Sequence, residues 1–118
     1  MIPDEKMLEL IKKALRIGGG THELEDILVG IRQNVFQLFS ADSAIVVTEI
    51  LQSPRKKILN VFLVAGDFES IMGLTPKVDE FAKSEGCSFM ITTGRFGLIR
   101  RLPKFGWNPA YVTFKREL

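Results

Sequence analysis

The chain has 118 residues, 46% of them hydrophobic, which suffices for one domain with a single buried core and no disulfide or metal support. Its 16 basic and 14 acidic side chains leave a formal net charge of +2, which excludes a strong overall field for nucleic acid or anionic lipid. The single cysteine, Cys87, excludes an intrachain disulfide framework, and no apolar run approaches the roughly 20 residues that span a bilayer.

The first part of the chain predicts two helices. The first begins near Pro3, with acidic residues in its first turn and basic residues in its last, and Gly18-Gly19-Gly20 ends it. Thr21 is expected to cap the second helix, whose apolar stripe is formed by Leu24, Ile27, Leu28 and Ile31. We expect the two helices to pair and to bury their apolar faces against another element.

Three β-rich runs follow at residues 35–39, 44–51 and 58–65, separated by turn residues. They predict a three-stranded antiparallel meander. The second and third runs are apolar at nearly every position, so both faces of the sheet should be covered. Glu49 and Asn60 are the polar exceptions.

The helical period returns after Gly66, with Asp67 expected as the cap. Pro76 interrupts this period, because proline lacks the N–H that a helix interior needs. The pattern predicts either one kinked helix or two short helices in line, the second capped by Thr75.

The last third predicts three further elements, namely a buried strand at 88–93, a helix at 95–105 that Pro103 kinks or shortens, and a closing strand at 110–115. The glycines of Gly94-Arg95-Phe96-Gly97 are explained by a tight corner between that strand and that helix. The complete order is ααβββαβαβ, which defines an α/β chain.

This order resembles the GNAT acyltransferase superfamily. The resemblance implies a truncated GNAT-like fold, with a mostly antiparallel sheet and helices on both faces, in a single domain over residues 1–118. The first and last strands of the superfamily have no counterpart here. The open sheet edges that this leaves suit the docking of a partner or of a second copy.

A second resemblance rests on short motifs. "AGD" at residues 65–67, "GC" at 86–87 and "GR-x-G" at 94–97 are similar to a group of small bacteriophage proteins, some of them GNAT-like. This resemblance implies a bacteriophage protein located in the virion or in the host cytoplasm.

The GNAT superfamily binds the pyrophosphate of acyl-coenzyme A through a glycine-rich R/Q-x-x-G-x-G/A loop. The corresponding residues 64–70 read VAGDFES, with one glycine and two acids. Asp67 as a cap would occupy the backbone donors and repel a phosphate. We therefore expect no cofactor, and Gly66, Asp67 and Phe68 are the cofactor-binding candidates only if acetyl-coenzyme A is used.

Glu49 is the candidate general base if the chain is an enzyme, because a carboxyl in an apolar strand can have a raised pKa. The favoured interpretation places Glu49 near solvent at the sheet edge and assigns no catalytic residue. Tyr111 lies on the closing strand and not where the superfamily keeps its general acid, which weakens the case for an enzyme. His22 is expected at the surface or as a cap, Cys87 in the core, and no spacing predicts a metal site.

Arg95, Arg100, Arg101 and Lys104 form the densest basic cluster of the sequence. Such a cluster is most often a solvated helix face, and it could also contact a partner protein or a nucleic-acid backbone. We therefore take these four residues as partner-binding candidates.

Three hypotheses for the function follow. The first is a non-catalytic bacteriophage accessory or virion-associated protein that docks to other proteins, with phage structural proteins or a second copy as partners and no membrane. The alternative is a small acetyl-coenzyme A-dependent N-acetyltransferase. The third is a nucleic-acid binder that uses the basic helix after Gly94.

Overall fold

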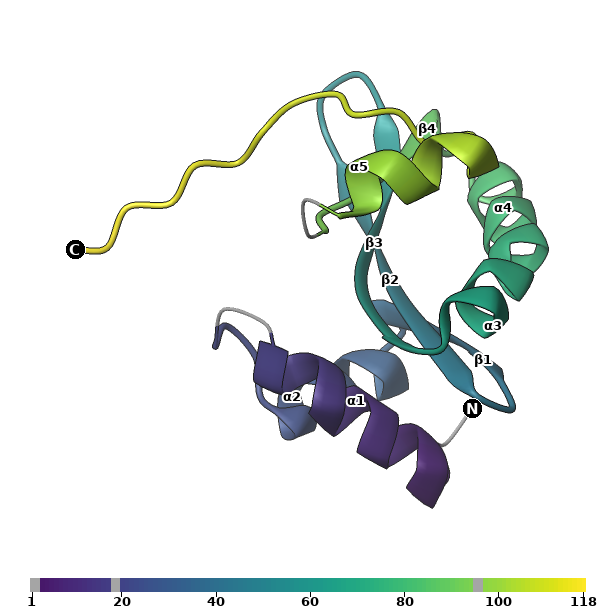
Figure 1. Cartoon of the computed structure of the whole chain (residues 1–118), viewed down its shortest axis with the longest axis vertical. Helices are drawn as coiled ribbons and strands as arrows, with labels where there is room; N and C mark the ends of the chain where they lie inside the picture. Colours follow the sequence, from purple (N-terminus) through teal and green to yellow (C-terminus); the bar gives the residue numbers. More distant parts are fainter. Residues whose placement is uncertain (1–2, 18–19, 95–96) are drawn as a thin grey trace.

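A four-stranded sheet in the order β1-β2-β3-β4 organises the computed structural model, which describes residues 3–17, 20–94 and 97–118 (Figure 1). Strands β1 (Phe36–Ala41), β2 (Ala44–Gln52) and β3 (Lys57–Gly66) form an antiparallel meander, and β4 (Phe89–Thr92) joins β3 in parallel. The predicted meander is confirmed, with strand ends displaced by at most two residues.

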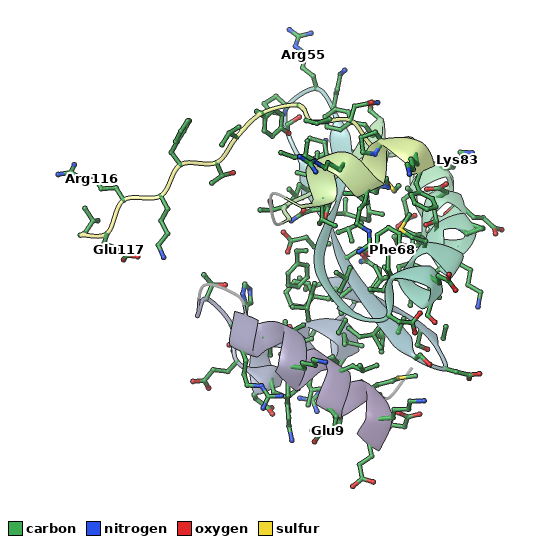
Figure 2. The ribbon with its side chains drawn as sticks, in the orientation of Figure 1. Glu9, Arg55, Phe68, Lys83, Arg116 and Glu117 are labelled. Carbon is green, nitrogen blue, oxygen red and sulfur yellow. The ribbon has the colours of Figure 1, made fainter. Side chains whose placement is uncertain are left out.

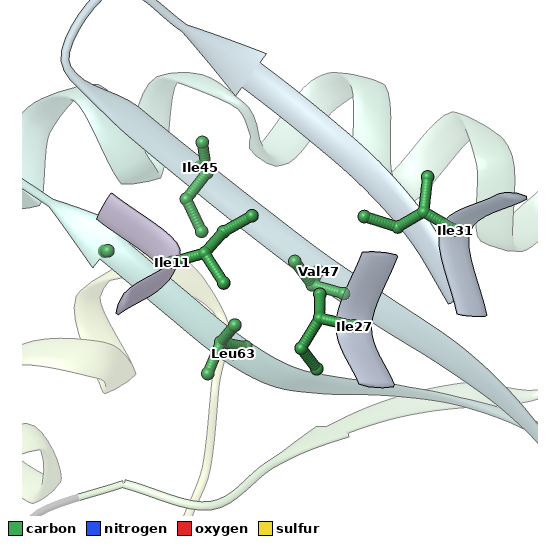
Figure 3. Packing of buried hydrophobic residues seen from close by; sticks show 7 residues of the cluster. Ile11, Ile27, Ile31, Ile45, Val47 and Leu63 are labelled. Carbon is green, nitrogen blue, oxygen red and sulfur yellow. The ribbon is translucent and has the colours of Figure 1, made fainter. Parts of the chain in front are cut away.

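Helices α1 (Glu5–Ile17) and α2 (Leu24–Arg32) lie together on one face of the sheet. Figure 3 shows the packing of this face, in which branched side chains of the helices meet those of the strands, namely Ile11, Ile27 and Ile31 against Ile45, Val47 and Leu63. The predicted helix pair and its cover are therefore confirmed. We call this side of the sheet the α1–α2 face.

The cap of α2 differs from the prediction. Its N-cap is Glu23, which forms a capping box with Asp26, and the Glu23 backbone N–H donates to Asp26 Oδ2 at 2.8 Å. The Thr21 hydroxyl instead contacts Nδ1 of His22, also at 2.8 Å. The prediction of a Thr21 cap was wrong because the reciprocal carboxylate pair satisfies the first free N–H groups two residues later.

Helices α3 (Phe68–Gly73) and α4 (Thr75–Ser84) cover the opposite face, where a second core is formed by Ala44, Val46, Leu59, Val61, Leu74, Val78 and Ala82. Of the two predicted arrangements, the pair of short helices is the one observed. Leu74 is the N-cap of α4, so Thr75 is its first residue and not its cap. Pro76 falls in the first turn, where a missing N–H costs nothing.

The last helix is shorter than expected. Helix α5 (Leu98–Arg101) passes into a 3₁₀ turn, η1 (Leu102–Phe105), which ends at Gly106 with φ of 88°. Pro103 accounts for the change, because its ring blocks the α-helical hydrogen bond. The start of the predicted helix, at residues 95–96, lies outside the described residues.

The predicted closing strand at 110–115 is wrong. From Trp107 onward the chain has no regular secondary structure, and Figure 1 shows this C-terminal segment leading away from the sheet. Its alternating apolar residues are typical of a strand, but a strand also requires an edge to pair with, and none is paired with it here. No helix among the described residues is long and apolar enough to cross a membrane.

Candidate functional site

The sheet opens between β3 and β4. The two strands pair only from Ile58–Phe89 to Val61–Thr92, and the Thr92 hydroxyl donates to the Val61 carbonyl at 2.8 Å at the end of the pairing. Strand β3 continues to Gly66, and no described strand lies beside residues 62–66 on that side. The peptide groups of this part of β3 therefore face an opening.

A β-bulge in β3 coincides with this opening. Val47 of β2 pairs with Leu63, and the next residue, Thr48, pairs with Val61, so Phe62 is the extra residue. Val61 belongs to the core under α3 and α4, whereas Phe62 packs on the α1–α2 face. Two consecutive residues at the end of the β3–β4 pairing thus face opposite layers of the molecule.

An apolar cavity of about 150 Å³ lies on the α3 side of the opening. Its walls come from strands β2, β3 and β4 and from the helices and the segment on that side of the sheet, and they include Val61, Val64, Phe68, Leu98 and Trp107. Val64, near the end of β3, is 42% exposed, although its neighbours Leu63 and Ala65 are buried. The cavity can accept a small apolar group from solvent.

A cluster of aromatic rings lies on the other face. The Phe36 and Phe62 ring centroids are 4.8 Å apart, and the His22 ring lies 6.2 Å from Phe36 and 5.7 Å from Phe62. The prediction of a surface or capping role for His22 missed this contact, because the helix start is far in sequence from the bulge.

Glu49 lies beside this aromatic cluster. It is the register partner of both Phe36 and Asn60, and residues directly opposite each other in antiparallel strands share a face. Asn60 Nδ2 donates to Glu49 Oε1 at 3.2 Å, and both side chains are half-buried. The candidate base is therefore held in place inside the sheet, and not at its solvent edge.

Gly66 has a structural reason to be glycine. Its φ is 118°, and a Cβ at this position would lie 2.0 Å from the Ser43 carbonyl oxygen. The residue therefore permits the close approach of β3 to the β1–β2 turn. Its presence in the candidate cofactor loop is explained without a ligand.

Asp67 caps α3, as predicted. Its carboxylate accepts hydrogen bonds from the Ser70 backbone N–H at 2.9 Å and from the Ser70 hydroxyl at 2.8 Å. These hydrogen bonds lower the pKa of Asp67, so the start of α3 has a carboxylate charge at neutral pH.

Arg101 brings positive charge to the same place. Its guanidinium lies over the Phe68 ring, 3.7 Å from the centroid, and the Phe105 ring meets Phe68 edge-on at 5.5 Å. Figure 2 shows Phe68 between α3 and α5. Phe68, a candidate from the cofactor loop, is therefore in contact with Arg101, a candidate from the basic cluster.

The other members of the basic cluster are placed in part. Arg100 and Lys104 are exposed on the same segment as Arg101, and Arg95 lies outside the described residues. The assignment of these four residues to partner binding stays a prediction.

The remaining candidates lie outside this site. Cys87 is half-buried at the end of α4, and its loss of contact with water raises the pKa of its thiol, with Lys57 opposing and Glu85 adding to the shift. Tyr111 is 74% exposed on the C-terminal segment. In the described part of the chain, no group of three or more His, Cys, Asp or Glu residues could hold a metal ion.

Comparisons with solved structures identify the fold. A Trypanosoma brucei acetyltransferase matches 96% of this chain and 91% of its own with a TM-score of 0.70 and 15% identity. Glucosamine-6-phosphate N-acetyltransferase from Arabidopsis thaliana matches 96% and 89%, with the same TM-score and identity. An aminoglycoside acetyltransferase from an uncultured soil sample, solved with sisomicin, matches 96% and 86% with a TM-score of 0.68 and 14% identity.

These matches confirm the α/β, GNAT-like fold. No family model matches the chain, and no curated protein sequence does so. The first hypothesis, a non-catalytic bacteriophage accessory protein, was wrong, because the matching folds are those of acetyltransferases and nothing in the comparisons supports a phage origin. The matches favour the alternative drawn from the sequence.

Proposed function

We propose that the chain is an acyl-coenzyme A-dependent N-acyltransferase, the activity that the GNAT resemblance implies. One observation carries the proposal. The apolar cavity, lined by Val61, and the aromatic cluster beside Glu49, which includes Phe62, lie on opposite faces of the sheet and both border the place where β3 and β4 separate. A reaction between two substrates needs two binding surfaces that meet at one point. The opening of the sheet provides that point.

The described residues fit the acyl arm of such a molecule. An acyl-coenzyme A has an extended arm with two amide groups and a terminal thioester. Residues 62–66 of β3 have no described strand beside them on the side away from β2, so the peptide groups that point to that side can pair with these amides as an added strand would. The cavity next to Val64 suits a short acyl group, because its walls are apolar.

The phosphates fit a different surface from the one the GNAT resemblance implies. Asp67 and Glu69 put negative charge at the start of α3, where the superfamily has a glycine-rich loop. Arg101 lies over Phe68 next to this position, and Arg100 and Lys104 are on the same segment. We infer that these three cations hold the phosphates in place of the loop, since a guanidinium makes strong bidentate contacts with phosphate.

Glu49 is suited to accept a proton from the acceptor amine. Bound acyl-coenzyme A supplies an electrophilic thioester carbonyl, and an amine attacks such a carbon only after losing its ammonium proton. Asn60 fixes Oε1 of Glu49, and the ring faces of Phe36 and Phe62 attract a cationic amine to the same surface. The acceptor is thus expected to be an amine with positive charge at neutral pH.

Calorimetric titration with acetyl-coenzyme A tests the binding step. We expect a Kd below about 100 μM, near −5.5 kcal/mol. Arg101→Ala should weaken binding about tenfold or more by removing a charge-assisted contact. Arg55→Ala, which removes an exposed arginine in the β2–β3 turn (Figure 2), is the matched control and should not change it. Absence of binding would overturn the proposal.

Release of free thiol in the presence of a set of primary amines tests the chemical step. Glu49→Gln keeps the size of the side chain and removes its basicity. We expect it to lower kcat about 100-fold or more while the Kd for acetyl-coenzyme A stays unchanged. An unchanged kcat would exclude Glu49 as the base.

A further inference from the structure

The outer edge of β4 has hydrogen-bonding groups that no described strand uses. The Ser88 backbone N–H donates to the Lys57 carbonyl at 2.8 Å, so Ser88 points toward β3. Peptide groups alternate along a strand, and the N–H and C=O groups of Phe89 and Ile91 therefore point away from β3. Such an edge is a template for another strand.

The C-terminal segment has the composition of a strand but no partner strand. Residues 110–115 read AYVTFK, a run rich in the β-branched and aromatic residues that favour strands. Tyr111, Val112 and Phe114 are 74%, 63% and 91% exposed. An extended run of exposed apolar side chains on an otherwise folded chain indicates a surface that another molecule covers.

A groove of about 360 Å³ lies between this segment and β4. It is lined by Met90 and Ile91 of β4, by Leu102 and Trp107, and by residues 108–113. Because the segment and the strand line the same groove, the space between them is open. Ile99, which also lines the groove, is 53% exposed, so the groove has apolar area to cover.

We propose that residues 110–115 of a second copy occupy this groove and pair with the outer edge of β4, and that two copies exchange these segments reciprocally. A second copy is the occupant because the same chain has both the unpaired edge and the unpaired strand. The exchange closes as a twofold dimer, in which each contact is made twice.

The exchange covers the apolar groups that are exposed in one copy. Successive side chains of a strand point to opposite sides, so Val112 and Phe114 share one side. On that side they would meet Ile99 and Leu102, and the edge groups of Phe89 and Ile91 would gain backbone partners. Strand addition of this kind obtains affinity from the backbone and specificity from alternate side chains.

Sedimentation equilibrium of the full chain tests the proposal. We expect a dimer, with a dissociation constant that rises about 100-fold or more when Val112→Asp and Phe114→Asp are combined. These two side chains are exposed in the single copy, so the variant should still unfold cooperatively, at the midpoint that the wild type has when it is diluted below its dissociation constant. Ile91→Pro removes one outward N–H of β4 and should have a similar effect, whereas Ile91→Val keeps that donor and should not.

A mixing experiment distinguishes exchange between two copies from pairing of residues 110–115 with β4 of their own chain. The variant with Val112→Asp and Phe114→Asp, which we call the tail variant, keeps a complete β4 edge. Ile91→Pro keeps residues 110–115 intact. A mixture of the two proteins can therefore form one of the two contacts. Native mass spectrometry of the mixture at about 100 μM should show the heterodimer. A monomeric wild type, a dimer that survives in the tail variant, or a mixture without heterodimer would each overturn the proposal.

Discussion

The α1–α2 face of the sheet is closed by large branched side chains, whereas α3 and α4 close the opposite face only in part. Ile11, Ile27, Ile45 and Val47 have no exposed area at all. On the other face, Val64 is 42% exposed and lines a cavity, although it is on the same strand as buried residues. The first face is packed throughout, and the second has an open cavity beside its packed core.

Gly66 gives the largest expected effect, because it lies where the open face begins. If it served a ligand, Gly66→Ala would reduce affinity and leave the fold intact. We expect a loss of about 3 kcal/mol or more in unfolding free energy instead, since the new Cβ meets the Ser43 carbonyl at 2.0 Å and φ is 118°. Urea denaturation measures the loss.

Gly73→Ala is the control for this substitution. No atom lies within 4 Å of a Cβ at Gly73, which ends α3. Replacing glycine by alanine in a helix should be neutral or add up to about 1 kcal/mol of stability. Equal effects of the two substitutions would contradict the structural role of Gly66.

Two valine truncations compare the faces with the same chemical change. Val47→Ala should lower the unfolding free energy by about 2–3 kcal/mol, because it leaves a cavity in a fully buried cluster. Val64→Ala should cost less than about 1 kcal/mol, since its methyl groups already border solvent. Denaturation midpoints at a constant m-value test this difference, and similar losses would show that the open face is closed in solution.

The sequence predicted the meander and the cover of both faces because these follow from local periodicity. Residues 44–51 and 58–65 are apolar on both sides, and only a sheet between two helical layers can bury them. The closing strand at 110–115 had equally good local signals. It failed because pairing depends on where the segment lies relative to a sheet edge, which periodicity does not describe.

The candidate site could be predicted only in its separate parts. Glu49 was recognised as a polar residue in an apolar strand, but its bond to Asn60 depends on the β2–β3 register. That register contains the bulge at Phe62, which has no signature in this sequence. The stacking of Arg101 on Phe68 likewise depends on how α5 is placed over α3.

The pH dependence of the Asp67 cap should give the smallest effect on the open face. Hydrogen bonds from Ser70 lower the pKa of Asp67 in the folded state below its unfolded value. The charged cap therefore stabilises the fold above the unfolded pKa, and this contribution is lost as the pH falls through the folded pKa. Asp67→Asn keeps an acceptor oxygen but has no charge to lose. We expect Asp67→Asn to be slightly less stable than the wild type at pH 7, with the difference shrinking as the pH falls below the unfolded pKa and through the folded one. A difference that stays constant with pH would show that the charge contributes nothing to the cap.

We also expect Asp67→Asn to bind acetyl-coenzyme A more tightly than the wild type at pH 7. A carboxylate near the cations that we infer to hold the phosphates repels those phosphates, and the amide does not. Titration of both proteins with acetyl-coenzyme A measures the difference, and equal affinities would show that the phosphates lie beyond the reach of this charge.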